Sequence, residues 1–514
     1  MNSCEEHLTL EKLMERISVY KSKKPNNSIE SIGMTFETPD NVYFFDTGTG
    51  KVFRMDKYME QFMDQLLHGN NDVYQLRKMA EDNGLDIPQI LNYIEAEDLL
   101  KGTDSDKLYC KEFLEIADRE RRTKCQQLIL ELTGACNLRC KYCIYSSSEK
   151  GFRGFNSHNM EKETIIKAID YMRENGAEKV YITFYGGEPL ICFESLKFAI
   201  DYARESITDK EVFFGFTTNL TLMTRDKAEY LARIPNLSIV CSIDGPEEIH
   251  DANRVYCNGN GTYRDAIKGL NILKEEMEKV GNNTISINFN AVYMVPYSQE
   301  KLNAIDANFQ ELCQITKNSN YNITYPSNGT IPEEYEAVIP HNGDNSLWDW
   351  LADMARKCDS FDQFKGRGVI DSLAKIHNRM LTKFASCSIP MNSCCIPGTR
   401  RLYIDTQGDM YVCERINKSP KIGNINSGFD IKAIMTKYYY EYSDKSIKYC
   451  ANCWAAKMCP FCYADRMTED GISESAHANC GEARAFLKRQ FALYHELLEN
   501  DPHKLEILND YVEE

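Results

Sequence analysis

A chain of 514 residues exceeds what one hydrophobic core usually holds, so we expect two or three domains. Its 77 acidic and 60 basic residues give a net charge of −17, which argues against a nucleic-acid partner and suits a basic peptide better. The sequence shows no bilayer-spanning apolar run and no signal-peptide pattern, so we expect a cytoplasmic protein without a membrane partner, whose 20 cysteines are available as metal ligands.

The first hundred residues predict short strands followed by helices. Apolar residues favour strands over 34–36, 42–45 and 52–53, and helical periodicity follows over 58–67, 73–83 and 87–100. Three strands and three helices in this space are typical of a winged helix-turn-helix domain. Such domains commonly bind DNA, but this one lacks an arginine-rich recognition helix. Residues 101–124 are highly charged and predict a solvated linker or an exposed helix.

A regular alternation of apolar runs and amphipathic helices begins at residue 125. It predicts a parallel sheet with right-handed crossovers, and about six units indicate a partial α/β barrel over 125–330. Residues 331–383 predict a connector, and 384–514 a cysteine-rich C-terminal domain. The predicted barrel strands are 127–132, 180–185, 212–217, 237–243, 285–292 and 321–325, with helices such as 161–173, 196–204 and 263–280 between them. Functional residues of such barrels gather where the strands end.

The first barrel strand is followed by the cysteine motif Cys136-x3-Cys140-x2-Cys143. Three thiolates leave one iron of a 4Fe-4S cubane open, whereas a structural cluster or zinc site uses four ligands. With Tyr142 before the last cysteine, the motif resembles that of the radical S-adenosylmethionine (radical SAM) enzymes. The resemblance implies that the open iron binds the amino and carboxylate groups of S-adenosylmethionine. One electron then cleaves this cofactor to methionine and a 5'-deoxyadenosyl radical.

Further cofactor-binding candidates follow the next strands. A Gly-Gly pair alone is more often a turn, but beside the cysteine motif Gly186-Gly187-Glu188-Pro189 resembles the family's motif for the methionyl amino group, which Glu188 would complement in charge. Ser242 and Arg254 resemble residues that hold the ribose or carboxylate, although a surface arginine is the alternative. With Tyr142, the predicted cofactor-binding residues are Gly186, Gly187, Glu188, Asn219, Ser242 and Arg254.

Nine cysteines lie between residues 387 and 480. Their spacing alone is equally compatible with zinc ribbons and iron–sulfur clusters. Beside the radical motif, the block resembles the SPASM extension, which carries two auxiliary 4Fe-4S clusters, although two residues rather than three separate Cys459 from Cys462. The resemblance assigns the first cluster to Cys387, Cys395, Cys413 and Cys462, with Cys394 competing with Cys395, and the second to Cys450, Cys453, Cys459 and Cys480.

The motifs together resemble maturases of ribosomally synthesised peptides, in particular the sactipeptide synthases. The resemblance implies a fold of three parts: a partial (β/α)6 radical SAM barrel, a winged-helix-like peptide-recognition domain over 1–100 and a C-terminal SPASM domain. The N-terminal domain would take the leader peptide as an added strand. The enzyme would link a cysteine sulfur to an α carbon of the core peptide, using three 4Fe-4S clusters and an electron donor such as flavodoxin or ferredoxin.

One carboxylate and two rival functions complete the expectations. Sulfatase maturases carry an aspartate base next to the cluster ligand that corresponds to Cys413, so Glu414 is a candidate base; the alternative is a glutamate that only pairs with Arg415. The rival enzyme is an anaerobic sulfatase maturase that makes formylglycine, which would not need residues 1–100. The alternative that is not an enzyme is a zinc-ribbon binding protein, and it would leave the cysteine triad and Gly186-Gly187 unexplained.

Overall fold

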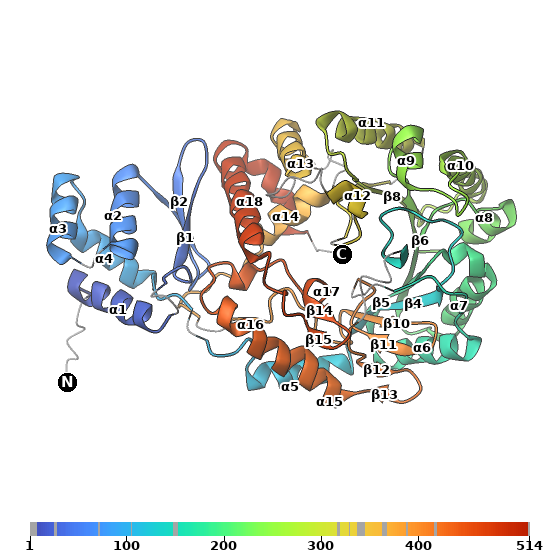
Figure 1. Ribbon diagram of the computed structural model, residues 1–514, viewed down its shortest axis with the longest axis horizontal. Coiled ribbons are helices and arrows are strands. Elements are labelled where there is room, and N and C mark those ends of the chain that lie inside the picture. Colours follow the sequence, from blue (N-terminus) through green and yellow to red (C-terminus); the bar gives the residue numbers. More distant parts are fainter. Residues whose placement is uncertain are drawn as a thin grey trace.

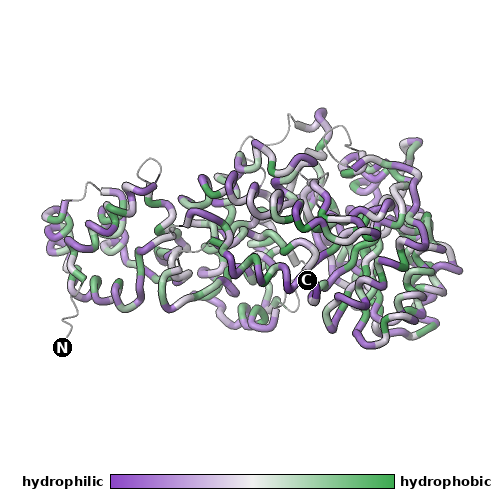
Figure 2. The backbone as a smooth tube through the Cα atoms, turned by 90° about the horizontal axis from the view of Figure 1, so that it is seen from below, coloured by the Kyte–Doolittle hydropathy of each residue, from purple (hydrophilic) through white to green (hydrophobic). Residues whose placement is uncertain are grey.

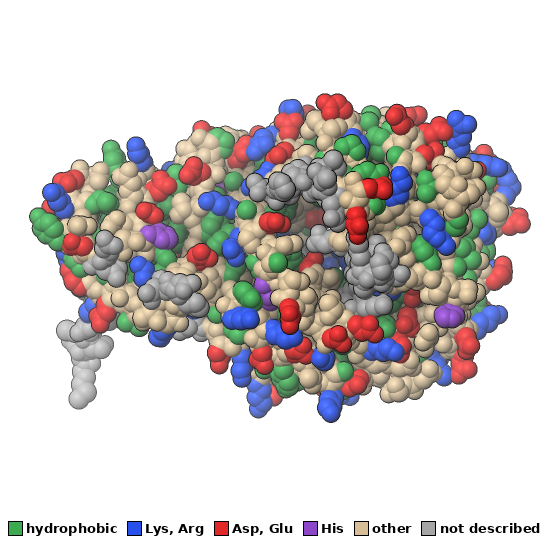
Figure 3. All heavy atoms as spheres, viewed as in Figure 1, with side chains coloured by type: hydrophobic (Ala, Val, Ile, Leu, Met, Phe, Trp, Pro, Cys, Tyr) green, Lys and Arg blue, Asp and Glu red, His purple; other side chains and the backbone are tan. Residues whose placement is uncertain are grey.

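A computed structural model describes residues 8–24, 28–69, 72–103, 105–146, 153–315, 319–327, 329–336, 345–361, 367–386, 389–415 and 419–511. Figure 1 shows the N-terminal region at one end of the long axis, a strand–helix barrel at the other and the C-terminal region between them. On the face seen in Figure 3, acidic and basic side chains are interspersed. Within the described ranges, no helix has both the length and the apolar character needed to cross a membrane.

The N-terminal region is a three-stranded antiparallel sheet, ordered β1-β2-β3, covered by four helices. Aspartates at the N-caps of three of these helices accept backbone hydrogen bonds, which fixes where each begins. The strands and helices predicted for this region are present, and a helix precedes them. The elements are α1 (Leu10–Ser22), β1 (Gly33–Glu37), β2 (Val42–Asp46), β3 (Val52–Met55), α2 (Lys57–His68), α3 (Val73–Asp82) and α4 (Ile87–Ala96).

Ring packing and hydrogen bonds join this region to the C-terminal part of the chain. Phe36 of β1 packs on Phe491 of α18 (Cys480–Asn500), with ring centroids 5.4 Å apart. The Lys457 ammonium group donates hydrogen bonds of 2.9 and 3.0 Å to the carbonyl oxygens of Thr47 and Gly48, in the turn between β2 and β3. The N-terminal region is therefore packed against the cysteine-rich region and is not a loosely tethered module.

Residues 101–124 differ from a simple solvated linker. They contain helix α5 (Lys111–Arg121), and its last residue is almost fully buried. Arg121 donates from Nε to the carbonyl oxygen of Pro397 at 3.1 Å and from Nη1 to Asp118 at 3.1 Å. The burial of Arg121 could not be predicted from the sequence, because most other charged residues of this segment do face solvent.

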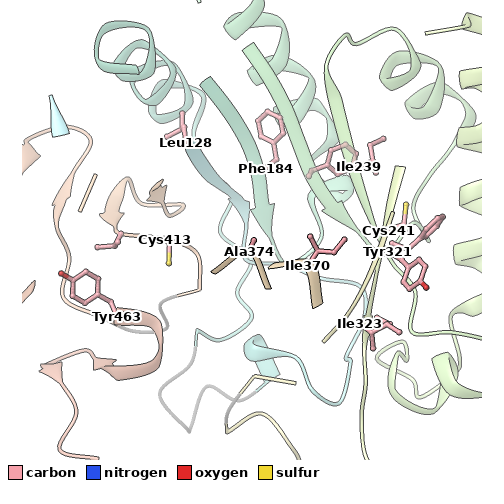
Figure 4. Packing of buried hydrophobic residues seen from close by; sticks show 14 of the residues in the cluster. Leu128, Phe184, Ile239, Cys241, Tyr321, Ile323, Ile370, Ala374, Cys413 and Tyr463 are labelled. Atoms are coloured by element: carbon pink, nitrogen blue, oxygen red, sulfur yellow. The ribbon is translucent and has the colours of Figure 1, made fainter. Parts of the chain in front are cut away.

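Six parallel strands, β4 to β9, form the barrel sheet in sequence order within the described part of the chain. Leu128 of β4, Phe184 of β5 and Ile239 of β7 lie in the core beneath the helices (Figure 4), and apolar segments lie mainly on the inside of the fold (Figure 2). The opposite, concave face is more polar, as the 2.9 Å hydrogen bond from Gln127 to Thr183 illustrates. The strands are β4 (Cys125–Thr133), β5 (Gly176–Gly186), β6 (Glu211–Thr218), β7 (Leu237–Ser242), β8 (Ser286–Val292) and β9 (Tyr321–Thr324).

Helices follow the barrel strands and cover their outer face in Figure 1. The concave face is therefore the side open to a substrate. The helices are α6 (Lys162–Asn175), α7 (Phe193–Ser206), α8 (Arg225–Ala232), α9 (Glu247–Asn253), α10 (Tyr263–Val280) and α11 (Gln299–Ile315), and the connector adds α12 (Glu333–Glu336), α13 (Ser346–Lys357) and α14 (Arg367–His377).

The C-terminal region extends the barrel sheet. Strand β10 pairs in parallel with β4, Arg401 lying opposite Gln127, and β11 to β13 add antiparallel strands beyond it. The otherwise open edge of β4 is thus covered. The elements are β10 (Arg401–Ile404), β11 (Asp409–Tyr411), β12 (Gly423–Asn424), β13 (Gly428–Phe429), α15 (Ile431–Ala433), a π-helical turn (Ile434–Glu441), α16 (Tyr442–Cys450), α17 (Tyr463–Arg466), β14 (Met467–Thr468), β15 (Gly471–Ile472) and α18.

Candidate active site

The three cysteines of the first motif lie in the loop after β4, at the carboxyl edge of the parallel sheet. Burial is the main cause that raises the pKa of Cys136 to about 12 and that of Cys140 to about 11, and the neighbouring cysteines contribute to both shifts. Thiols packed together in this way become thiolates only when a cation binds them. The donor set therefore fits a metal cluster.

Backbone hydrogen bonds hold the cysteine loop against the segment that follows α9. Arg139 N donates to the Val255 carbonyl at 2.7 Å, and Lys141 N donates to the Asn253 carbonyl at 3.0 Å. The loop also has an apolar cluster of its own, formed by Leu138, Cys140, Tyr142, Met294 and Val295. This packing buries Cys140 and leaves Cys136 and Cys143 half-buried.

Gly186 and Gly187 press the loop after β5 against the loop after β4. Gly186 has φ of +133°, and a Cβ atom there would lie 2.2 Å from the Thr133 carbonyl oxygen. A Cβ on Gly187 would lie 2.1 Å from the Ala135 carbonyl oxygen. Backbone bonds of 2.9 Å from Gly187 N to Thr133 O and from Glu188 N to Ala135 O complete the contact. Only glycine fits this spacing, so the pair positions the cysteine loop.

Glu188 is buried, and its carboxylate joins the ends of two strands. It accepts hydrogen bonds from Thr218 Oγ1 at 2.9 Å, from Asn219 N at 2.8 Å and from Leu190 N at 3.0 Å. A carboxylate has about four lone-pair positions, so one remains for a ligand ammonium group. The contacts of Glu188 in the structure hold the loop after β5 to the end of β6.

Asn219 connects the β6 end to the cysteine loop, because its Nδ2 donates to Asn137 Oδ1 at 3.0 Å. Asn137 in turn donates to Thr221 Oγ1 at 2.8 Å. Ser242, the last residue of β7, is half-buried and lies opposite Asn290 of β8. The sequence did not predict a role for Asn137, because asparagines are common in loops. Its position inside the cysteine motif is the one sequence feature that indicates it.

Arg254, Tyr142 and Asp244 form a buried chain of polar contacts beside Cys140. Arg254 Nη1 donates to Tyr142 Oη at 2.8 Å, and Tyr142 Oη donates to an Asp244 carboxylate oxygen. The Nε of Arg254 is buried and has no hydrogen-bond partner among the described residues. Arg254 is thus a buried cation and not a surface arginine. A donor left over in this position fits an anionic ligand group such as a carboxylate.

His250 supports this chain from the far side. Burial, followed by the positive charge of Arg254, lowers the pKa of His250 to about 3, so its ring is neutral. Its Nδ1 accepts from Asp244 N at 3.3 Å, and its Nε2 lies 3.0 Å from Thr262 Oγ1. The ring holds Asp244 in place and has no contact that would make it an acid or a base.

Comparison with known proteins identifies this part of the fold, because residues 130–291 match the model of the radical SAM superfamily. The chain contains a radical SAM domain. The chain is 27% identical over 328 residues to an uncharacterised protein of Methanocaldococcus jannaschii, and this alignment covers 63% of the chain and 98% of that protein. It is 23% identical over 349 residues to the serine-type anaerobic sulfatase-maturating enzyme of Bacteroides thetaiotaomicron, with coverage of 66% and 80%.

A solved structure shares the fold. Native anSMEcpe with bound AdoMet and Kp18Cys peptide aligns with a TM-score of 0.54 and 18% sequence identity, over 75% of this chain and 99% of that chain. The radical SAM family implies a 4Fe-4S cluster and S-adenosylmethionine. The grouped thiols of Cys136, Cys140 and Cys143 fit the cluster, and the unpartnered Nε of Arg254 fits the cofactor carboxylate.

Outside the radical SAM domain, the C-terminal cysteines form two groups defined by electrostatic contact between their thiols. Cys394 and Cys395 both lie near Cys462, while Cys450, Cys453, Cys459 and Cys480 make up the other group. Cys413 is buried and lies two residues after the end of β11, and Cys387 lies outside the described residues. Among the described residues, Cys136, Cys140 and Cys143 included, no three His, Cys, Asp or Glu side chains are close enough to bind one metal ion. A 4Fe-4S cluster binds each thiolate through a different iron and so does not need that spacing.

Glu414 lies between the C-terminal region and the radical SAM domain. Its Oε1 accepts from Arg401 Nη1 at 3.2 Å and lies 3.8 Å from Arg415 Nε, while its Oε2 is buried without a partner among the described residues. Burial raises the pKa of Tyr185, and the negative charges of Glu414 and of Cys143 raise it further. Glu414 and Cys143 are therefore both within electrostatic reach of Tyr185.

Gly187→Ala tests the loop contact. The added methyl group has no room beside the Ala135 carbonyl, so the cysteine loop must shift, and a shift of about 1 Å costs on the order of 10²-fold in rate. We expect cleavage of S-adenosylmethionine to 5'-deoxyadenosine under dithionite to fall by this amount. Gly368→Ala in α14 is the control, since its Cβ would be 3.4 Å from the nearest atom, Leu351 Cδ1. Full cleavage by Gly187→Ala would show that the contact does not position the cluster loop.

Proposed function

We propose that this protein is a radical SAM enzyme that modifies a ribosomally synthesised precursor peptide, joining a cysteine sulfur to an α carbon by a thioether bond. The observation that carries the proposal is the N-terminal sheet with an accessible edge, packed onto the catalytic regions. The structure of native anSMEcpe aligns with 75% of this chain and is itself covered over 99% of its length, so about a quarter of this chain lies outside the shared fold.

The proposed leader site is the outer edge of β3. The other edge strand, β1, packs on α18. Asp46 N donates to Lys51 O, so the pair Asp46–Lys51 is a hydrogen-bonded pair of the β2–β3 ladder. Such pairs alternate along antiparallel strands with pairs whose N–H groups point outward, and the N–H groups of Val52 and Arg54 therefore point away from β2. The exposed ring of Tyr93 meets Phe53 edge-on at 6.2 Å beside this edge. An added peptide strand would pair with free backbone groups and rest on these rings.

Thioether formation removes one hydrogen atom, one proton and one electron from the peptide. When bound, S-adenosylmethionine and the clusters supply the radical that takes the hydrogen atom and the acceptor that takes the electron. The chain itself keeps the site dry through the apolar cluster around Leu138 and Tyr142. We assign the cysteine proton to Glu414, whose Oε2 has no partner among the described residues.

Formylglycine formation is the second candidate function, because the sulfatase-maturating enzyme aligns over 66% of this chain. The two products differ chemically. A thioether consumes the cysteine thiol and leaves no aldehyde, whereas formylglycine is an aldehyde that reacts with hydrazides.

The direct test is anaerobic incubation of the reconstituted enzyme with candidate precursor peptides, S-adenosylmethionine and dithionite. We expect mass spectrometry to show the loss of two hydrogen atoms per crosslink, with the modified cysteine resistant to iodoacetamide. Fragmentation should place the bond at an α carbon. A hydrazide-reactive product would support formylglycine formation, and a peptide left unmodified alongside active cofactor cleavage would contradict both.

Arg54→Pro tests the leader site. Proline removes one outward N–H from the edge of β3 and spares the bonds to β2, so the full precursor should bind at least about tenfold more weakly, a loss of roughly 1.4 kcal/mol. Cleavage of S-adenosylmethionine should remain normal. Arg54→Ala keeps the backbone donor and is the matched control. Equal precursor affinity of the two variants would remove β3 from leader recognition.

Glu414→Gln tests the proposed base. The amide cannot accept a cysteine proton, so peptide modification should fall by roughly 10²–10⁴-fold while cofactor cleavage continues. Glu506→Gln, at an exposed carboxylate, is the control and should behave as the wild type. Near-normal modification by Glu414→Gln would assign the proton to another acceptor.

A further inference from the structure

Arg466, the last residue of α17, is 1% exposed and lies inside the cysteine-rich region. Its Nη2 is 3.6 Å from Cys459 Sγ and 3.9 Å from Cys480 Sγ, in donor geometry to both. A buried guanidinium is costly unless negative charge lies beside it. Arg466 forms no ion pair with a carboxylate within the described ranges, so the two sulfur atoms are the groups that can balance its charge.

Arg466 is held in this position by neutral partners. Its Nη1 donates to Asn392 Oδ1 at 3.1 Å and to Tyr442 Oη at 3.0 Å. Asn392, whose φ is +55°, also turns its Nδ2 toward Cys450 Sγ at 3.9 Å. One network thus provides donors to three of the four cysteines in this group. The fourth, Cys453, lies near Arg484, whose positive charge opposes the rise in its pKa caused by burial.

The neighbouring cysteine group has the opposite environment. Cys462 N donates to Asp465 Oδ2 at 2.9 Å, and this carboxylate, after burial, raises the pKa of Cys462. Cys413 precedes Glu414 in the sequence. Arg466 also lies within electrostatic reach of Cys394, but it makes no hydrogen bond to a described cysteine of that group. The two groups therefore differ in the side chains bonded beside them: the Asp465 carboxylate at Cys462 in one group, and the Arg466 guanidinium at Cys459 and Cys480 in the other.

We propose that Arg466 is a positioning residue that raises the reduction potential of the cluster held by Cys450, Cys453, Cys459 and Cys480. The proposal rests on the proposed auxiliary clusters. A 4Fe-4S cluster gains one negative charge when it takes up an electron, with no bond made or broken, and nearby positive charge and hydrogen bonds to sulfur favour that state. With both clusters bound, this environment would make the second cluster the better acceptor for the electron that peptide crosslinking releases.

The test compares Arg466→Met and Arg466→Lys in the full-length chain, after anaerobic reconstitution, by redox titration followed by electron paramagnetic resonance. Replacing Cys136, Cys140 and Cys143 by Ala in all samples removes the radical-cluster signal. With Arg466→Met, the ratio of reduced to oxidised second cluster should fall at least tenfold at the wild-type midpoint, which corresponds to 59 mV for one electron. Lysine retains the charge and should give a smaller shift. The other auxiliary signal should move less in both.

Arg489→Met on α18 is the matched control, because this arginine forms an exposed ion pair with Asp349. Unchanged midpoints with full iron content would overturn the role of Arg466 and leave the proposed function intact. Wild-type protein with zinc or no iron at these cysteines would overturn the auxiliary clusters as well. If Arg466→Met loses iron, Arg466→Gln decides, because it removes the charge and keeps a hydrogen-bond donor: a midpoint shift with iron retained supports the role, and an unchanged midpoint overturns it.

Discussion

The close contact between two backbone segments, 133–135 and 186–188, is the constraint on which the site depends. It requires two glycines in succession, since any Cβ would enter the carbonyl oxygens of Thr133 or Ala135. The contact fixes the cysteine loop at the end of β4 and places Glu188 where it joins β5 to β6. The position of the three thiols is thus determined by packing between loops, and the barrel behind these loops is the rigid scaffold.

Periodicity and spacing predicted much of the fold. The six barrel strands lie close to their predicted positions because buried parallel strands are apolar runs, and the glycine pair was found because it follows one of them. Residues that act through distant partners were not predictable. Asp244 and Arg466 carry no local pattern, and their roles come from contacts with residues remote in the sequence. The choice between Cys394 and Cys395 also stays open, since both lie near Cys462.

The N-terminal region is joined to the cysteine-rich region at the loop that carries the second cysteine group. Lys457, between Cys453 and Cys459, bonds to the β2–β3 turn, and Lys24 at the end of α1 donates to the carbonyl oxygen of Ala451 at 3.0 Å. A peptide that binds β3 therefore acts on a surface rigidly connected to these cysteines. Any effect of such a peptide on the cysteine loop must be matched by an equal effect of the loop on peptide affinity.

The pairing of β10 with β4 affects how the chain reaches its native state. Every radical SAM motif is complete before residue 291, yet the outer edge of β4 finds its partner only when Arg401–Ile404 has been made. A growing chain on the ribosome thus carries an unpaired, apolar strand edge throughout the synthesis of the whole barrel. Such edges recruit strands from other chains. We therefore expect fragments that end before β10 to aggregate.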